Sequence, residues 1–105
     1  MEYREQVKCC VGTADLAAEF IDDLFDNHEP LWNADNYVGF IGGDAVVLTY
    51  KDNRIIVKYT TGDMDGVRRA AQSVLDEMDY ENPDEEGWKH KAFVVDNEVR
   101  LRYVK

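Results

Sequence analysis

The sequence predicts an α+β fold, a two-layer sandwich in which an antiparallel sheet of about five to six strands carries two helices on one face. Segments 13–29 and 64 to about 80 repeat apolar residues at helical spacing, and the segments around them alternate polar and apolar residues as strands do. Residues 52–53 and 96–97 are both Asp-Asn pairs, which suit the two-residue turns of hairpins. The predicted element order is β-α-β-β-β-α-β-β.

The length of 105 residues is that of one ordinary domain, so we expect residues 1–105 to form a single globular α+β domain. Asp and Glu number 22 against 12 Lys and Arg, which gives a formal net charge of −10. A nonspecific nucleic-acid binder needs a net basic surface, so direct nucleic-acid binding is not expected, and basic partner proteins are favoured. An alternative cause of the acidity is adaptation to a salt-rich cell, in which some proteins are acidic throughout, whereas the acidic residues of this chain are clustered.

Residues 3–11 alternate in polarity and predict an N-terminal strand. This strand holds both cysteines, Cys9 and Cys10. Because neighbours on a strand point to opposite faces, we expect no internal disulfide and a reducing, cytoplasmic setting, although one outward thiol could link two chains. Residues 1–10 lack the apolar core of a secretory signal, and no apolar run reaches membrane-spanning length.

Residues 13–29 predict the first helix, which Thr13 caps and Pro30 stops. Its apolar face consists of Leu16, Ala17, Phe20, Ile21, Leu24 and Phe25. At about 100° per residue, five carboxylates fall within an arc of roughly 80° and form an acidic ridge. The ridge consists of Asp15, Glu19, Asp22, Asp26 and Glu29, and Asp23 widens it.

The segment that carries the acidic ridge contains no Lys or Arg. Like charges one turn apart destabilise a helix by about 0.2–0.5 kcal/mol per pair, so a purely structural face would be more stable with mixed charges. The six carboxylates are therefore the predicted partner-binding residues. The simpler alternative is an acidic face that is only solvated, as runs of charge usually are.

Residues 31–36 are predicted to form a loop, and residues 37–41 are predicted to form a short strand. The clearest hairpin joins the predicted strands 45–51 and 54–60. Its two-residue turn sets a register that pairs Lys51 with Arg54, Tyr50 with Ile55, Leu48 with Val57, and Val46 with Tyr59. These pairs put six side chains on the core face: Val46, Leu48, Tyr50, Ile55, Val57 and Tyr59.

Asp63 is predicted to cap a second helix over residues 64 to about 80. Its buried face is expected to hold Val67, Ala71, Val74, Leu75 and Met78. An acidic cluster marks its far end and the following loop: Asp76, Glu77, Asp79, Glu81, Asp84, Glu85 and Glu86. Residues 88–95 and 98–104 form the last predicted hairpin, whose inward side chains are Ala92, Val94, Val99, Leu101 and Tyr103.

The two hairpin registers together place most basic residues on the outer face of the sheet: Arg4, Lys8, Lys51, Arg54, Lys58, Lys91, Arg100 and Arg102. A solvated face is the ordinary explanation, since long basic side chains cover a sheet well. The functional alternative is that this face binds an anionic ligand or a single nucleic-acid strand. The residues for that role are Lys51, Arg54, Lys58, Arg100 and Arg102, with Phe93 as a stacking surface.

The sequence contains no catalytic, metal or cofactor pattern. His28 is predicted to lie near the end of the first helix and His90 at an inner strand position, and neither has metal-ligand spacing with the cysteines. The glycines form no phosphate-binding loop. We therefore expect a protein that is not an enzyme and uses no cofactor or metal.

The predicted function is a non-enzymatic interaction module that presents the acidic ridge, together with the acidic cluster, to a basic partner protein. Its most specific form is an inhibitor that occludes a nucleic-acid-binding surface, as a nucleic-acid mimic. In size, acidity and lack of active-site motifs the chain resembles small phage inhibitors such as anti-CRISPR and anti-restriction proteins, and this resemblance is one of composition. Two alternative functions are compatible with the same composition. One is a toxin-immunity protein, and the other is a homo-oligomer that joins the basic face of one copy to the acidic face of the next.

Overall fold

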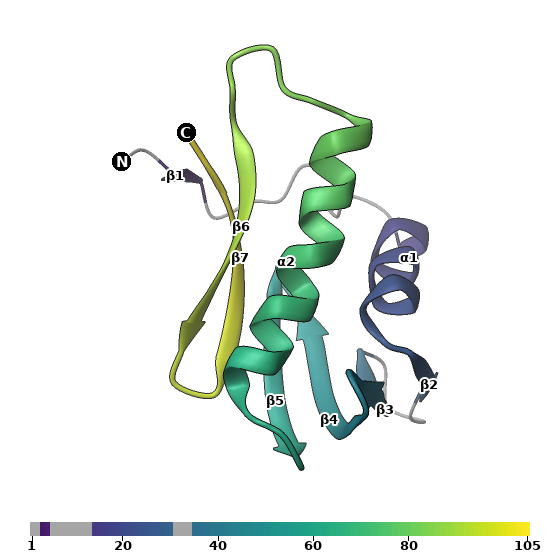
Figure 1. Ribbon diagram of the computed structural model, residues 1–105. Helices are drawn as coiled ribbons and strands as arrows, with labels where there is room; N and C mark the ends of the chain where they lie inside the picture. Colours follow the sequence, from purple (N-terminus) through teal and green to yellow (C-terminus); the bar gives the residue numbers. More distant parts are fainter. Residues whose placement is uncertain (1–2, 5–13, 31–34) are drawn as a thin grey trace.

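The structure, a computed structural model, describes residues 3–4, 14–30 and 35–105. In this part of the chain the fold is α+β, with one antiparallel sheet and two helices packed on the same face of it (Figure 1). The predicted fold class is confirmed. In chain order the elements are β1 (Tyr3–Arg4), α1 (Ala14–Leu24), β2 (Asn27–Pro30), β3 (Asn36–Ile41), β4 (Asp44–Lys51), β5 (Arg54–Thr60), α2 (Met64–Glu81), β6 (Lys89–Val95) and β7 (Glu98–Val104).

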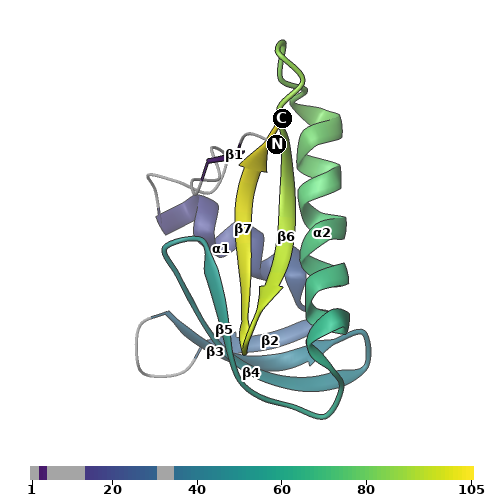
Figure 2. The ribbon, with the colours of Figure 1, turned by 90° about the vertical axis from the view of Figure 1, so that its left-hand side faces the viewer.

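The long strands of the sheet lie in the spatial order β3, β4, β5, β7, β6, with the short β2 added beside β3, and all neighbours are antiparallel. β6 pairs with the whole length of β7, so β5 and the two-residue β1 share the opposite side of β7. In Figure 2, β6 and β7 run crosswise to β3 and β4, and the sheet curls around the helices. This curvature follows from a twist that accumulates from strand to strand.

The core fills the concave side of the sheet, between the strands and both helices. The helices contribute Phe20, Ile21 and Leu24 from α1, and Val67, Ala71, Val74 and Leu75 from α2. The strands contribute alternating residues, among them Val46, Leu48, Tyr50, Ile55, Val57, Val99 and Leu101. All of these positions were predicted to face inward, and burial of each large apolar side chain contributes about 1.5–3 kcal/mol.

The first helix ends earlier than predicted. Its last hydrogen bond runs from the Phe25 N–H to the Ile21 carbonyl (3.1 Å), and the next N–H, that of Asp26, donates to the carbonyl of Phe40 on β3 (2.8 Å). The chain therefore leaves the helix and joins the sheet at Asp26.

Residues 27–30 pair along β3 as strand β2, so Glu29 and His28 lie on a strand. The predictions that the helix and its acidic ridge extend to Glu29, and that His28 lies near a helix end, are wrong. Carboxylates are unfavourable at a helix C-terminus, and the side of β3 that faces away from β4 offers hydrogen-bond partners to the backbone instead.

The turn of the central hairpin has the predicted geometry. Asp52 and Asn53 both have positive φ, 53° and 59°, as a type I′ turn requires. The strands pair in the predicted register from this turn as far as Leu48 with Val57. The turn chemistry of the sequence therefore sets the register of the adjoining half of the hairpin.

Beyond that point the register shifts by one residue. A β-bulge places Val47 opposite Tyr59 and Val46 opposite Thr60, whereas the sequence predicted Val46 opposite Tyr59. Since a shift of one residue moves a side chain to the other face, Tyr59 is 53% exposed rather than part of the core. The prediction for Tyr59 is wrong for this reason.

The second helix has the predicted start, and its side chains bind the adjacent strand β6. Asp63 is the N-cap and accepts a hydrogen bond from the Gly66 N–H (2.8 Å). On β6, the Asp79 carboxylate accepts from the His90 backbone N–H (2.8 Å) and also bonds Nδ1 of the His90 ring. The side-chain amide of Gln72 donates to the His90 carbonyl (3.0 Å) and accepts from the N–H of Ala92 (2.9 Å).

Some predictions concern residues 5–13 and 31–34, which lie outside the described residues. They include most of the strand expected over residues 3–11, with Cys9 and Cys10. The N-cap at Thr13 and four positions of the loop expected over 31–36 also fall there.

Candidate protein-docking surface

The predicted partner-binding residues lie on three successive parts of the chain. Four belong to α1, one follows its end and one lies on β2: Asp15, Glu19, Asp22 and Asp23, then Asp26, then Glu29. Glu19, Asp22, Asp23 and Asp26 are exposed. The helical part of the acidic ridge is therefore shorter than predicted, because Asp26 and Glu29 lie beyond the end of α1.

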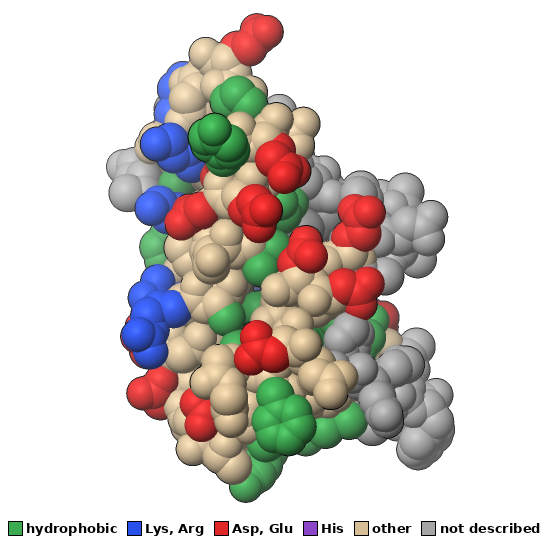
Figure 3. Space-filling view, turned by 45° about the vertical axis from the view of Figure 1, so that its right-hand side comes forward, with side chains coloured by type: hydrophobic (Ala, Val, Ile, Leu, Met, Phe, Trp, Pro, Cys, Tyr) green, Lys and Arg blue, Asp and Glu red, His purple; other side chains and the backbone are tan. Residues whose placement is uncertain are grey.

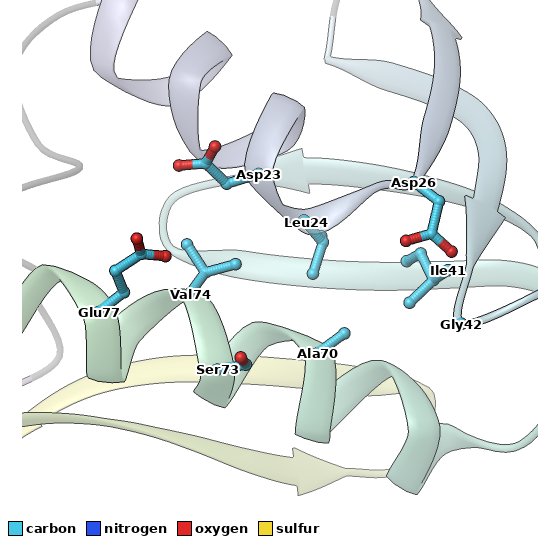
Figure 4. A pocket seen from close by; sticks show the side chains of 9 residues that line it. All are labelled: Asp23, Leu24, Asp26, Ile41, Gly42, Ala70, Ser73, Val74 and Glu77. Carbon is cyan, nitrogen blue, oxygen red and sulfur yellow. The ribbon is translucent and has the colours of Figure 1, made fainter.

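A groove between α1 and α2 is lined by two of these carboxylates together with a third from α2. The groove has a volume of about 330 Å³, with Asp23 and Asp26 on the α1 side and Glu77 on α2 (Figure 4). The rest of its lining is mostly apolar or small: Leu24, Ile41, Gly42, Ala70, Ser73 and Val74. We call this site the acidic groove.

The three carboxylates of the acidic groove have no ion-pair partner in the part of the chain that the structure describes. Within residues 3–4, 14–30 and 35–105, neither an ion pair nor a side-chain hydrogen bond involves Asp23, Asp26 or Glu77. The basic residues of α2, Arg68 and Arg69, both pair with Asp65 in the first turn of that helix. Figure 3 shows carboxylates spread over the helical face, with Lys and Arg gathered along one margin.

Asp22 lies near a different group, the phenol of Tyr37 on β3. The pKa of Tyr37 is raised above its ordinary value of 10.0, chiefly because burial disfavours the phenolate and further because Asp35 and Asp22 are negative. Since the pKa is raised in the folded state, the neutral ring contributes stability below pH about 10, and this contribution is lost as the pH rises through the folded-state pKa.

We expect Asp22→Asn to lower the pKa of Tyr37 toward its ordinary value, because one of the negative charges is removed. The measurement is an ultraviolet titration of tyrosine, with Tyr37→Phe as the reference that identifies the Tyr37 signal among the six tyrosines. Glu19→Gln is the matched control and should leave the titration unchanged. An unchanged Tyr37 pKa in Asp22→Asn would contradict the placement of Asp22.

The acidic cluster at the end of α2 divides into structural and solvent-facing residues. Asp79 bonds His90, and the Asp84 carboxylate accepts from the backbone N–H groups of Glu86 (2.9 Å) and Trp88 (3.2 Å). Glu81, like Glu77, is exposed on α2. The predicted binding role of the cluster therefore rests on its exposed members, among them Glu77 and Glu81.

Sequence reasoning missed Tyr80, which is 88% exposed at the end of α2. At about 100° per residue, Tyr80 falls within roughly 60° of Ser73 and Glu77 around the helix, so it continues the wall of the acidic groove. The sequence did contain a signal for this residue. Tyr80 follows Glu77 by three residues and Asp76 by four, so it neighbours both on the helix surface, and it lies outside the apolar face of the helix.

Comparisons with known proteins return nothing similar: no protein family, no curated protein and no solved structure matches the chain. Among the described residues, no cluster of three or more His, Cys, Asp or Glu could hold a metal ion. In the same part of the chain, neither helix combines the length and the apolar character needed to cross a membrane.

Proposed function

We propose that this protein is a non-enzymatic interaction module whose acidic groove binds a basic surface of a partner protein and thereby blocks access of nucleic acid to that surface. The observation that carries the proposal is that Asp23, Asp26 and Glu77, from two separate parts of the chain, line one groove and have no ion-pair partner among the described residues.

The composition of the acidic groove suits one kind of side chain. Its floor includes the nearly buried Leu24 and Val74, and the more accessible Ala70 can contact the methylene groups of an Arg or Lys. Its rim carries the carboxylates that can receive the charged end. Charge-assisted hydrogen bonds between carboxylates and Arg are about twice as strong as neutral ones, so an Arg of the partner is the preferred occupant.

The arrangement favours a protein partner over a metal ion or a small cation. Tyr80, exposed at the end of the same wall, offers a large aromatic surface of the type found at the centres of protein interfaces. Proteins bind the phosphates of nucleic acid through basic surfaces, so carboxylates that occupy such a surface would exclude that ligand.

The test uses the full chain as bait for proteins of its own host. A captured partner is purified, loaded with a fluorescent nucleic acid, and titrated with this protein at low and high salt. The expected result is release of the nucleic acid, with weaker release at high salt, since the contacts are ionic. Retention of the nucleic acid at saturating concentrations would contradict the inhibitory role.

We expect Tyr80→Ala to weaken the complex with the captured partner by roughly 5- to 30-fold, the loss typical of an aromatic anchor at an interface. The side chain is almost fully exposed, so the variant should keep the thermal stability of the wild type. Calorimetric titration measures the affinity. The matched control is Tyr59→Ala, which removes a half-exposed tyrosine from the sheet and should bind normally.

A further inference from the structure

We propose that the outer face of the sheet is a second binding site, which takes single-stranded nucleic acid along a row of residues that crosses four strands. The register places Lys51 of β4 beside Arg54 of β5, Arg54 beside Arg100 of β7, and Arg100 beside Phe93 of β6. We call these four residues the basic row. Their strand neighbours, among them Ile55 and Val99, are buried against the helices, so the row lies on the face turned away from the acidic groove.

The basic row is unusual because it sets like charges directly opposite each other. Cross-strand neighbours of the same sign destabilise a sheet, and Lys51 with Arg54 and Arg54 with Arg100 are two such pairs. Two residues further along the same strands, Lys91 lies opposite Arg102. A sheet face that is only solvated would be more stable if positively and negatively charged side chains alternated across the strands. The row of like charges therefore favours an anionic ligand that spans several strands.

One carboxylate lies within this set of cations. Glu98 accepts a hydrogen bond from Nε of Arg100 (3.0 Å), and it leaves 29% of the Arg100 side chain exposed. Lys51, Arg54 and Lys91 are exposed on the same sheet. The Glu98 carboxylate therefore occupies one edge of the Arg100 guanidinium, where it would compete with a phosphate of the ligand.

Phe93 indicates which polyanion fits. Its ring is 38% exposed at one end of the basic row, with the Arg102 guanidinium carbon 5.7 Å from the ring centroid. An aromatic ring on an open sheet offers a surface on which an unpaired base stacks, while neighbouring cations meet the phosphates. In a duplex the base faces are already stacked, so the geometry favours a single strand.

The net charge of −10 excludes binding by overall attraction, so the site depends on its local charges. The carboxylates of α1 and α2 lie beyond a helical layer about 10 Å thick, and the Debye length at physiological salt is about 8 Å, so their repulsion is largely screened at the outer face. Two of the basic residues predicted for this face are left out of the proposal: Lys8 lies outside the described residues, and Arg4 belongs to the two-residue strand β1 rather than to the basic row.

The test is fluorescence anisotropy of a labelled dT strand of about 20 nucleotides, measured with the full chain over a series of salt concentrations. Arg54→Gln with Arg100→Gln is expected to weaken binding at least about tenfold and to lower the slope of log affinity against log salt by about 1.4, because two phosphate contacts are lost. Phe93→Ala should weaken binding by at least about fivefold. Glu98→Gln should tighten it, because Arg100 is released.

The matched control is Arg68→Gln with Arg69→Gln, which makes the same change of net charge on the helical face and should bind like the wild type. Thermal unfolding verifies that each variant is folded. The proposal is overturned if the wild type does not bind at low salt or if both double variants lose affinity equally. It is also overturned if heparin or duplex DNA binds as well as the single strand and Phe93→Ala has no effect, since the face would then be a general polyanion surface.

Discussion

Replacing Asp23 and Asp26 with Asn and Glu77 with Gln is expected to weaken the complex with the captured basic partner roughly 100-fold, or about 3 kcal/mol. The three carboxylates are the charged lining of the acidic groove and have no ion-pair partner among the described residues. In a complex each of them would meet a cation at close range, and the amides keep the shape of the side chains but not the charge. Calorimetric titration at two salt concentrations gives both the affinity and its salt dependence.

The fold of this triple variant should be unaffected or slightly more stable. Asp23 lies one helical turn from Glu19, and removal of one such like-charge pair relieves about 0.2–0.5 kcal/mol. The control changes the same number of charges elsewhere: Asp52→Asn and Asp96→Asn in the hairpin turns, with Glu85→Gln in the loop after α2. Asn tolerates the positive φ of both turn positions. If this control loses as much affinity as the groove variant, binding depends on net charge alone and the groove is not the site.

Replacing Asp79 with Ala is expected to lower the free energy of unfolding by about 2–4 kcal/mol. Asp79 accepts from the His90 backbone N–H and bonds the His90 ring, which is only 3% exposed, so the change leaves two buried polar groups of β6 without their partner. For a domain of this size the loss corresponds to a fall in the unfolding midpoint of more than roughly 8 °C. Urea or thermal unfolding followed by circular dichroism measures it.

Glu81→Ala is the matched control for Asp79→Ala, since it removes an exposed carboxylate from the same end of α2 and should change stability by less than about 0.5 kcal/mol. A second variant tests the contact itself. When His90→Leu is combined with Asp79→Ala, the joint loss should be smaller than the sum of the two single losses by at least about 1 kcal/mol. Strict additivity would contradict a direct Asp79–His90 interaction.

The parts of the fold that local chemistry determines could be predicted from the sequence. Asp63 caps α2, and Asp52-Asn53 forms the turn that aligns Leu48 with Val57. Each of these features depends on residues close in the chain, whose preferences are strong. The same holds for most inward positions of the last hairpin, where alternation identifies Val99 and Leu101 as core. The prediction for Val94 is wrong, since this side chain near the hairpin turn is 41% exposed.

The features that were mispredicted depend on contacts between distant segments. Residues 27–30 have no strand pattern of their own and become β2 because β3 pairs with them. The bulge before Tyr59 has no sequence signal, yet it decides the face of that ring. The acidic groove likewise exists only because α1 packs beside α2, so Asp23 could be predicted as an exposed carboxylate but not as the neighbour of Glu77.

The contacts between α2 and β6 restrict how other molecules can join this domain. The last strand of a sheet normally leaves backbone groups open to any extended peptide, which can then lengthen the sheet by one strand. On β6 the N–H and carbonyl of His90 and the N–H of Ala92 are already bonded to Asp79 and Gln72. An incoming chain would have to displace these side chains of α2 before it could pair with that part of β6, so growth of the sheet is opposed there.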